Sequence, residues 1–230
     1  MLYNIFMNAF IEYIAIFFAL LIVLPFHEFA HAFAAVKSGD MTPKLYKRYT
    51  LNPLAHFDIT GILCFVFFRF GWAKPVPVNP NNFKHYKRGC FFVSIAGVLM
   101  NYLIAFIAYP LFLLAQKYVP ESWSYLGKLI IYFPLFLYVL SINFFVFNLL
   151  PIYPLDGFRV LDVATKRRGK VYYFLRNNGQ KILLGLILLG VIANITNFYY
   201  IDILGIAMNF LRGIVSYPIE LLWNFVFGVI

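Results

Sequence analysis

Charge, acidic residues and cysteine are all scarce in this sequence, and each shortage argues against a class of protein. Only 12% of the 230 residues are charged, whereas 63% are hydrophobic and 21% are aromatic. A soluble domain carries about 25% charged residues, so this chain is too apolar to be one. The two cysteines, Cys64 and Cys90, lack C-x-x-C spacing, which argues against a thiolate zinc site and a disulfide framework.

The few charges are mostly basic, with 9 Asp and Glu against 19 Lys and Arg. Such an excess can indicate nucleic-acid binding, but these basic residues lie in connections between apolar runs, so we expect no nucleic-acid partner. Nine lie between residues 37 and 90, and seven lie between 159 and 181. By the positive-inside bias both regions face the cytoplasm, which places the N-terminus outside.

The apolar runs predict an all-α polytopic membrane protein with about five transmembrane helices in a lipid bilayer. Each run is near the ~20 residues that a span requires. The runs cover residues 13–36, 91–115, 129–150, 182–200 and 203–230, the last interrupted by Arg212, Pro218 and Glu220. Five spans place the C-terminus inside. The first run lacks a charged leader and a small-residue cleavage site, so we expect it to remain as a helix rather than be removed as a signal peptide.

Residues 59–80 are predicted to form a re-entrant β-hairpin-like loop. The apolar part, residues 59–70, is too short to span a membrane. Pro75, Pro77 and Pro80 follow it and favour extended backbone. Irregular backbone at membrane depth needs protein or a wet cavity around its amides, so we expect this loop beside a functional site. The alternative is an interfacial surface loop anchored by Trp72.

Two of the four histidines, His27 and His31, belong to the motif HEFAH, which lies inside an apolar run. On a helix they share a face and can hold one metal ion, with Glu28 beside the water on that ion. The alternatives are a hydrogen-bonded core histidine or a chance H-E-x-x-H. Ionisable residues within a membrane helix cost about 2.5 to 3.5 kcal/mol each, which favours a functional site.

A catalytic zinc site needs a third protein ligand, and Asp156 is the best candidate. It follows two prolines and precedes Gly157 on broken helix at the basic side of the membrane. The alternative is a helix-terminal Asp in water. His56 and His85 lie in predicted loops, so we expect neither to be a ligand. Ten residues separate His27 from Lys37, which places the metal roughly 10 to 15 Å below the basic surface.

Four linked motifs between residues 20 and 160 resemble the site-2 proteases, a family of intramembrane zinc metalloproteases. In the family order they are HEFAH at 27–31, GWAKPVPVNP at 71–80, Ala96-Gly97 with Asn101, and NLLPIYPLDG at 148–157. Val98 stands where the family usually has proline. The resemblance implies that His27, His31 and Asp156 hold one Zn²⁺ per chain and that Glu28 is the general base.

The resemblance also implies a role for Asn148 in binding the substrate backbone or oxyanion, with a helix–helix hydrogen bond as the alternative. The loop with Trp72, Lys74 and Asn79 is expected to capture an unwound substrate by strand addition. The substrates implied are single-span membrane proteins. No stretch is long enough for a PDZ or CBS domain. We therefore expect one integral membrane domain over residues 1–230, with a core at 13–160 and accessory helices at 182–230.

The expected function is regulated intramembrane proteolysis by a zinc metalloprotease. We expect it in the cytoplasmic (inner) membrane of a bacterium, with the active site toward the cytoplasm. A protease that trims prenylated proteins usually has a downstream Glu as its third ligand, so Asp156 argues against that interpretation. A zinc transporter would need midplane ligands and repeated halves. A non-proteolytic homologue would lack Glu28.

Overall fold

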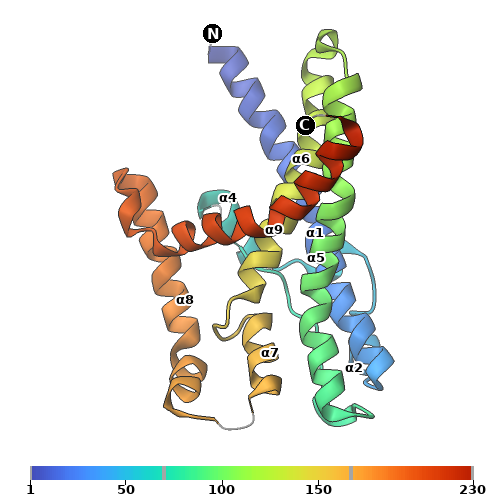
Figure 1. Cartoon of the computed structure of the whole chain (residues 1–230), viewed down its shortest axis with the longest axis vertical. Coiled ribbons are helices and arrows are strands. Elements are labelled where there is room, and N and C mark those ends of the chain that lie inside the picture. Colours follow the sequence, from blue (N-terminus) through green and yellow to red (C-terminus); the bar gives the residue numbers. More distant parts are fainter. Residues whose placement is uncertain (1, 69–70, 166–167, 229–230) are drawn as a thin grey trace.

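Four long helices dominate the computed structural model, which describes residues 2–68, 71–165 and 168–228 (Figure 1). They are α1 (Leu2–Ser38), α5 (Tyr86–Tyr118), α6 (Ser124–Leu149) and α8 (Lys170–Thr196). Each is long and apolar enough to cross a membrane, so the chain is an integral membrane protein. The prediction of an all-α polytopic protein is confirmed at this level.

The core of the protein lies where α1, α5 and α6 pack together. Fully buried alanines line the contact, with Ala15 and Ala19 on α1 and Ala105 and Ala108 on α5. Small side chains let helix backbones approach closely, which is how membrane helices gain packing energy without a hydrophobic driving force. This close packing holds the middle of α1, and therefore HEFAH, in a fixed position against α5.

The fifth long helix, α9 (Ile203–Phe227), is not among the four helices that meet the length and hydropathy requirements for a span. It lies obliquely across α6 and α5 (Figure 1). Its last turns lie toward the end of the molecule where α1 begins (Figure 1). The predicted side of the C-terminus stays a prediction. The count of five spans therefore stays a prediction.

Residues 59–80 take a different form from the predicted hairpin. Residues Ile59–Phe68 form the helix α4, because this run is apolar apart from Thr60 and contains no proline. Residues 71–79 are extended, and the β-pairing found within the described residues is a single antiparallel bridge between Phe57 and Ala73. Residues 69–70 lie outside the described part of the chain. The re-entrant position of this segment in the membrane stays a prediction.

Short helices complete the connections between the long ones. They are α2 (Thr42–Leu45), α3 (Pro53–His56), η1 (Pro80–Asn82), η2 (Glu121–Trp123), α7 (Asp156–Ala164) and η3 (Tyr199–Ile201). Helix α7 packs against α5 and the end of α6, so its first residue reaches the same region as HEFAH.

Candidate metal centre

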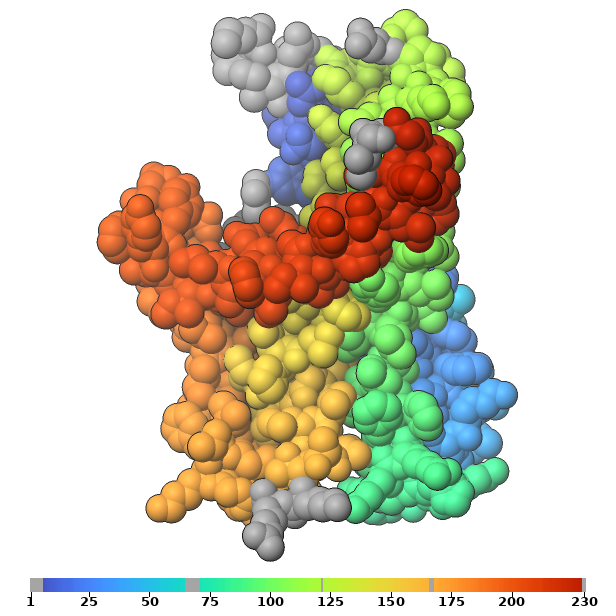
Figure 2. All heavy atoms as spheres, in the orientation of Figure 1, coloured from blue at the N-terminus to red at the C-terminus, as the bar shows by residue number. Residues whose placement is uncertain are grey.

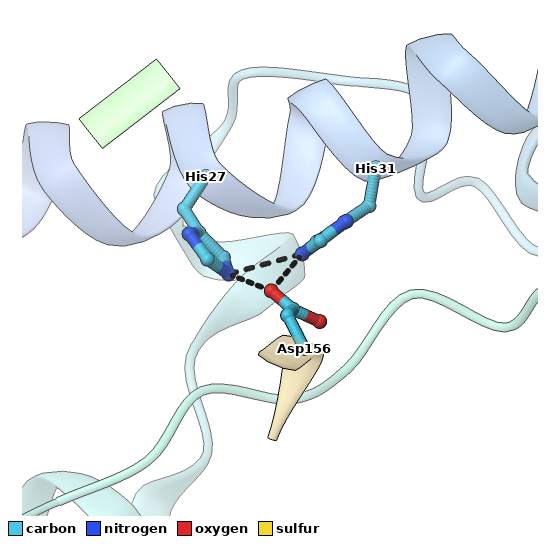
Figure 3. A group of neighbouring side chains, drawn as sticks. All are labelled: His27, His31 and Asp156. Carbon is cyan, nitrogen blue, oxygen red and sulfur yellow. Dashed lines mark hydrogen bonds and ion pairs between the residues drawn. The ribbon is translucent and has the colours of Figure 1, made fainter. Parts of the chain in front are cut away.

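His27, His31 and Asp156 meet in the interior of the protein (Figure 3). The two imidazoles project from the same face of α1, and the carboxylate approaches from the first turn of α7. The His31 Nε2 atom lies 3.0 Å from Asp156 Oδ2, and the His27 Nε2 atom lies 3.4 Å from it. The two Nε2 atoms are 3.0 Å apart. All three residues are buried, with 5 to 6% of their surface exposed.

The Asp156-Gly157 pair explains why the carboxylate can reach this position. A β-carbon on Gly157 would overlap the carbonyl oxygen of Leu149 and would lie 2.6 Å from the carbonyl oxygen of Leu150. Only glycine therefore lets the start of α7 pack under the end of α6. The backbone N–H of Phe158 then donates to the Leu155 carbonyl and starts the new helix beside the histidines.

The three atoms fit the donor set of a zinc ion. Asp156 Oδ2 is buried without a hydrogen-bond donor, which is costly for a carboxylate unless a cation lies beside it. Tetrahedral zinc bonds of about 2.0 to 2.1 Å separate neighbouring ligand atoms by about 3.3 to 3.4 Å. The observed separations of 3.0 to 3.4 Å are close to that spacing. Two imidazoles and one carboxylate also leave a fourth position free.

Helix α5 orients both imidazoles by contacting their Nδ1 atoms. The Nδ1–H of His31 donates to the Val93 carbonyl at 2.7 Å, which leaves its Nε2 lone pair toward Asp156. The amide of Asn101 lies 3.0 Å from His27 Nδ1. A 180° rotation of that amide lets Oδ1, which otherwise lies buried without a donor, accept the Nδ1–H. His27 then also presents a free Nε2.

Glu28 lies beside this group but does not join it. Its Oε2 accepts the backbone N–H of Val76 at 3.0 Å, so one carboxylate oxygen is held by the extended segment 71–79. Glu28 is only half-buried, unlike the two histidines on either side of it. The carboxylate therefore lies between a buried centre and a more open face.

The extended segment 71–79 lies along α1 and is fastened at three points. Besides the bond from Val76 to Glu28, the N–H of Lys74 donates to the His56 carbonyl at 2.7 Å. The N–H of Asn79 donates to Asp40 Oδ2 at 2.8 Å. The side chains of Trp72, Lys74 and Asn79 are exposed, and none of them belongs to the His-His-Asp group.

Asp40 is the fully buried anchor of this segment, just beyond the end of α1. Its Oδ1 also accepts the N–H of Thr42 at 3.0 Å and the amide of Asn82 at 2.8 Å. Burial opposes ionisation of the carboxyl, but these donors outweigh it and hold the pKa of Asp40 below its ordinary value. Nothing in the local sequence indicates this role, because Asn79 lies 39 residues away along the chain.

Two other predicted positions lie apart from the centre. The Asn148 amide donates to the carbonyl of Phe144 in its own helix at 3.0 Å, and the substrate role predicted for it is untested. His56 is fully buried, and its Nε2 donates to the Thr50 carbonyl at 2.8 Å. It is therefore an interior residue and not an exposed loop residue, although it is not part of the three-residue group.

Residues 15–192 match the family model described as peptidase family M50, which is the site-2 protease family. The chain belongs to this family. A protein of Bacillus subtilis (strain 168) with the name "Putative zinc metalloprotease YwhC" is 39% identical over 143 residues. That match covers 62% of this chain and 65% of the relative, which is less than two thirds of its length. No solved structure matches the chain.

Proposed function

We propose that this M50 protein is an intramembrane zinc metalloprotease that hydrolyses peptide bonds within or near transmembrane segments, as in regulated intramembrane proteolysis. The observation that carries the proposal is the buried triangle of His27 Nε2, His31 Nε2 and Asp156 Oδ2 beside the Glu28 carboxylate. We assign one Zn²⁺ per chain to these three ligands. When bound, zinc supplies Lewis-acid activation of water and of a peptide carbonyl.

In this proposal Glu28 is the general base. One carboxylate oxygen is held by Val76, which leaves Oε1 to take a proton from the attacking water. The same group can then return the proton to the leaving amine. Asn148 would bind the substrate or the oxyanion only after breaking its hydrogen bond to the Phe144 carbonyl. We therefore propose substrate or oxyanion binding as a secondary role for Asn148.

The extended segment 71–79 would bind the unwound substrate. The N–H groups of Lys74 and Val76 point to one side, toward α3 and α1, because residues two apart share a side in extended chain. Ala73, Pro75 and Pro77 then face the other side, where the prolines offer carbonyl acceptors but no N–H donor. Strand addition there would rely on N–H groups of the substrate. Trp72, Lys74 and Asn79 would contact the substrate from this segment.

We further propose that residues 1–230 act as one membrane domain, with a core at 13–160 and accessory helices at 182–230. The excess of Lys and Arg between residues 37–90 and 159–181 supports a site facing the cytoplasm. A bacterial cytoplasmic membrane is the location that we infer, and single-span membrane proteins are the substrates.

The decisive experiment compares Glu28→Gln with Asp156→Ala in the purified full-length protein. Metal content by elemental analysis is measured beside cleavage of a helical transmembrane substrate in detergent. Glu28→Gln should keep zinc and lose about 10² to 10⁴ in rate, whereas Asp156→Ala should lose both. Wild-type activity in Glu28→Gln contradicts the proposed base. Zinc flux into vesicles without any cleavage would favour a transporter instead.

A further inference from the structure

Two cavities lie at opposite ends of the extended segment 71–79. The first, of about 800 Å³, is mostly apolar, is open on one side and is lined by residues of α1, α4, α6, α8 and α9. Gly71 and Trp72 line it, as does Leu24 of α1, one turn before Glu28. The second, of about 730 Å³, is lined by Val76 and Val78 from the other end of the segment. A polypeptide lying along this segment would thus run from one cavity into the other.

The second cavity, which we call the basic cavity, lies between the start of α5 and helix α7. Both are at the end of the molecule opposite the N-terminus (Figure 2). Lys87, Arg159 and Arg168 line it. Among the lining residues that the structure describes, the one acid is Asp162, which is already bound by Arg168 at 2.7 Å and by the Tyr172 hydroxyl at 2.6 Å. The cavity therefore carries a net positive charge.

Two of these cations can reach a ligand, Lys87 without an ion pair among the described residues and Arg159 with only a long one. Within the described part of the chain, no ion pair is found for Lys87, whose side chain is exposed. The guanidinium of Arg159 lies 3.8 Å from Asp156 Oδ1, and the Arg159 side chain is half exposed. Arg159 therefore extends from the candidate metal centre to the basic cavity. Positive charge beside a binding segment favours an anionic partner and disfavours a cationic one.

We propose that the basic cavity binds acidic residues in the membrane-flanking part of the substrate and so selects substrates by charge. This inference rests on the proposed protease function. A peptide is favoured over a lipid headgroup because Val76 belongs both to the cavity wall and to the hydrogen bond with the proposed base. Any chain positioned for cleavage beside Glu28 and continuing along the segment enters this cavity.

The apolar cavity fits the membrane part of the same substrate. A helix about 10 Å in diameter occupies about 420 Å³ per 5.4 Å turn, so 800 Å³ holds about two turns. The substrate class is therefore a transmembrane helix that unwinds beside Trp72 and carries Asp or Glu on the flank beyond the cleaved bond.

The test uses full-length, zinc-loaded protein and three single-span substrates that differ only in four residues of the cytoplasmic flank, which are Glu, Gln or Lys. We expect kcat/KM to fall about fivefold from Glu to Gln and again from Gln to Lys. The change is this small because an ion pair in a partly solvent-exposed cavity contributes little binding free energy. Lys87→Glu should abolish the preference, because the described lining residues then carry as many acids as cations. Arg88→Glu is the matched control, since Arg88 is the next residue of α5, is exposed and does not line the cavity.

Sodium chloride at 1 M should remove the preference by screening. Equal rates of the wild type on all three substrates, or the same loss of preference in Arg88→Glu, would overturn the inference while leaving the protease proposal in place. If the wild type cleaves no substrate, the protease proposal fails. The charge preference is then tested by measuring how tightly the three labelled flank peptides bind to the wild type and to Lys87→Glu. Displacement of the Glu peptide by phosphatidylglycerol, dependent on Lys87, would instead identify a lipid site and contradict the proposal.

Discussion

Gly97 lies directly against the His27 imidazole, so closely that a β-carbon on it would come within 2.6 Å of the ring carbon Cε1. The same β-carbon would overlap His31 Nε2. Helix α5 packs along α1 here, so a ring that moved away from the added β-carbon would leave the triangle formed with Asp156.

Gly97→Ala is therefore expected to abolish zinc binding while the protein still folds. The added methyl group must displace one or both imidazoles, and a lost ligand lowers metal content as well as cleavage. Gly213→Ala is the matched control, because a β-carbon added to that helical glycine would meet no atom within 4 Å. Full zinc occupancy in Gly97→Ala would show that the rings are not where the structure places them.

Asn101→Leu should weaken zinc binding by about 10- to 100-fold, the usual effect of removing a residue that orients a metal-bound histidine. The leucine keeps the buried volume but cannot form the hydrogen bond that joins the Asn101 amide to His27 Nδ1. Titration with a competing chelator measures the change. Ser141→Ala is the control, since Ser141 is also fully buried and its hydroxyl has no partner among the described residues. Equal zinc affinity in Asn101→Leu and wild type would exclude the orienting role.

The meeting of His27, His31 and Asp156 was the part of the structure most open to prediction from sequence. His27, His31 and Asp156 are ligand-type residues in an apolar background, and a helix brings positions four apart onto one face. The Val93 carbonyl could not be predicted, because every residue has one. The early start of α8 was also missed. Its basic residues, such as Arg176 and Lys181, indicated a loop, although long cationic side chains also occur on helix ends, where they extend toward water.

Asp40→Asn should lower the stability of the protein by about 2 kcal/mol at pH 7, since hydrogen bonds to a charged group are lost. The pKa of this carboxyl is depressed in the folded state, so its contribution is full above the ordinary value of 3.8 and is lost as the pH falls further. The difference between variant and wild type should therefore shrink below that pH. Thermal unfolding in detergent between pH 7 and pH 3 checks this, and a constant difference across the range would argue against it.

Zinc should stabilise the folded protein by mass action. A ligand at 100 times its Kd stabilises the state that binds it by about 2.7 kcal/mol. Removing zinc with a chelator is expected to lower the Tm, and adding zinc back should restore it. Asp156→Ala serves as the control because it lacks one ligand and should show a much smaller shift. Equal zinc-dependent shifts in the two proteins would place the stabilising metal elsewhere.

The hydrogen bond between the Val76 N–H and Glu28 Oε2 means that one carboxylate has two roles. It fastens the extended segment to α1 while serving as the proposed proton acceptor. A movement of the segment away from α1 would break this bond and free the Glu28 side chain, so the position of the segment sets the position of the proposed base. Docking of segment 71–79 on α1 and the orientation of the Glu28 carboxylate are therefore coupled.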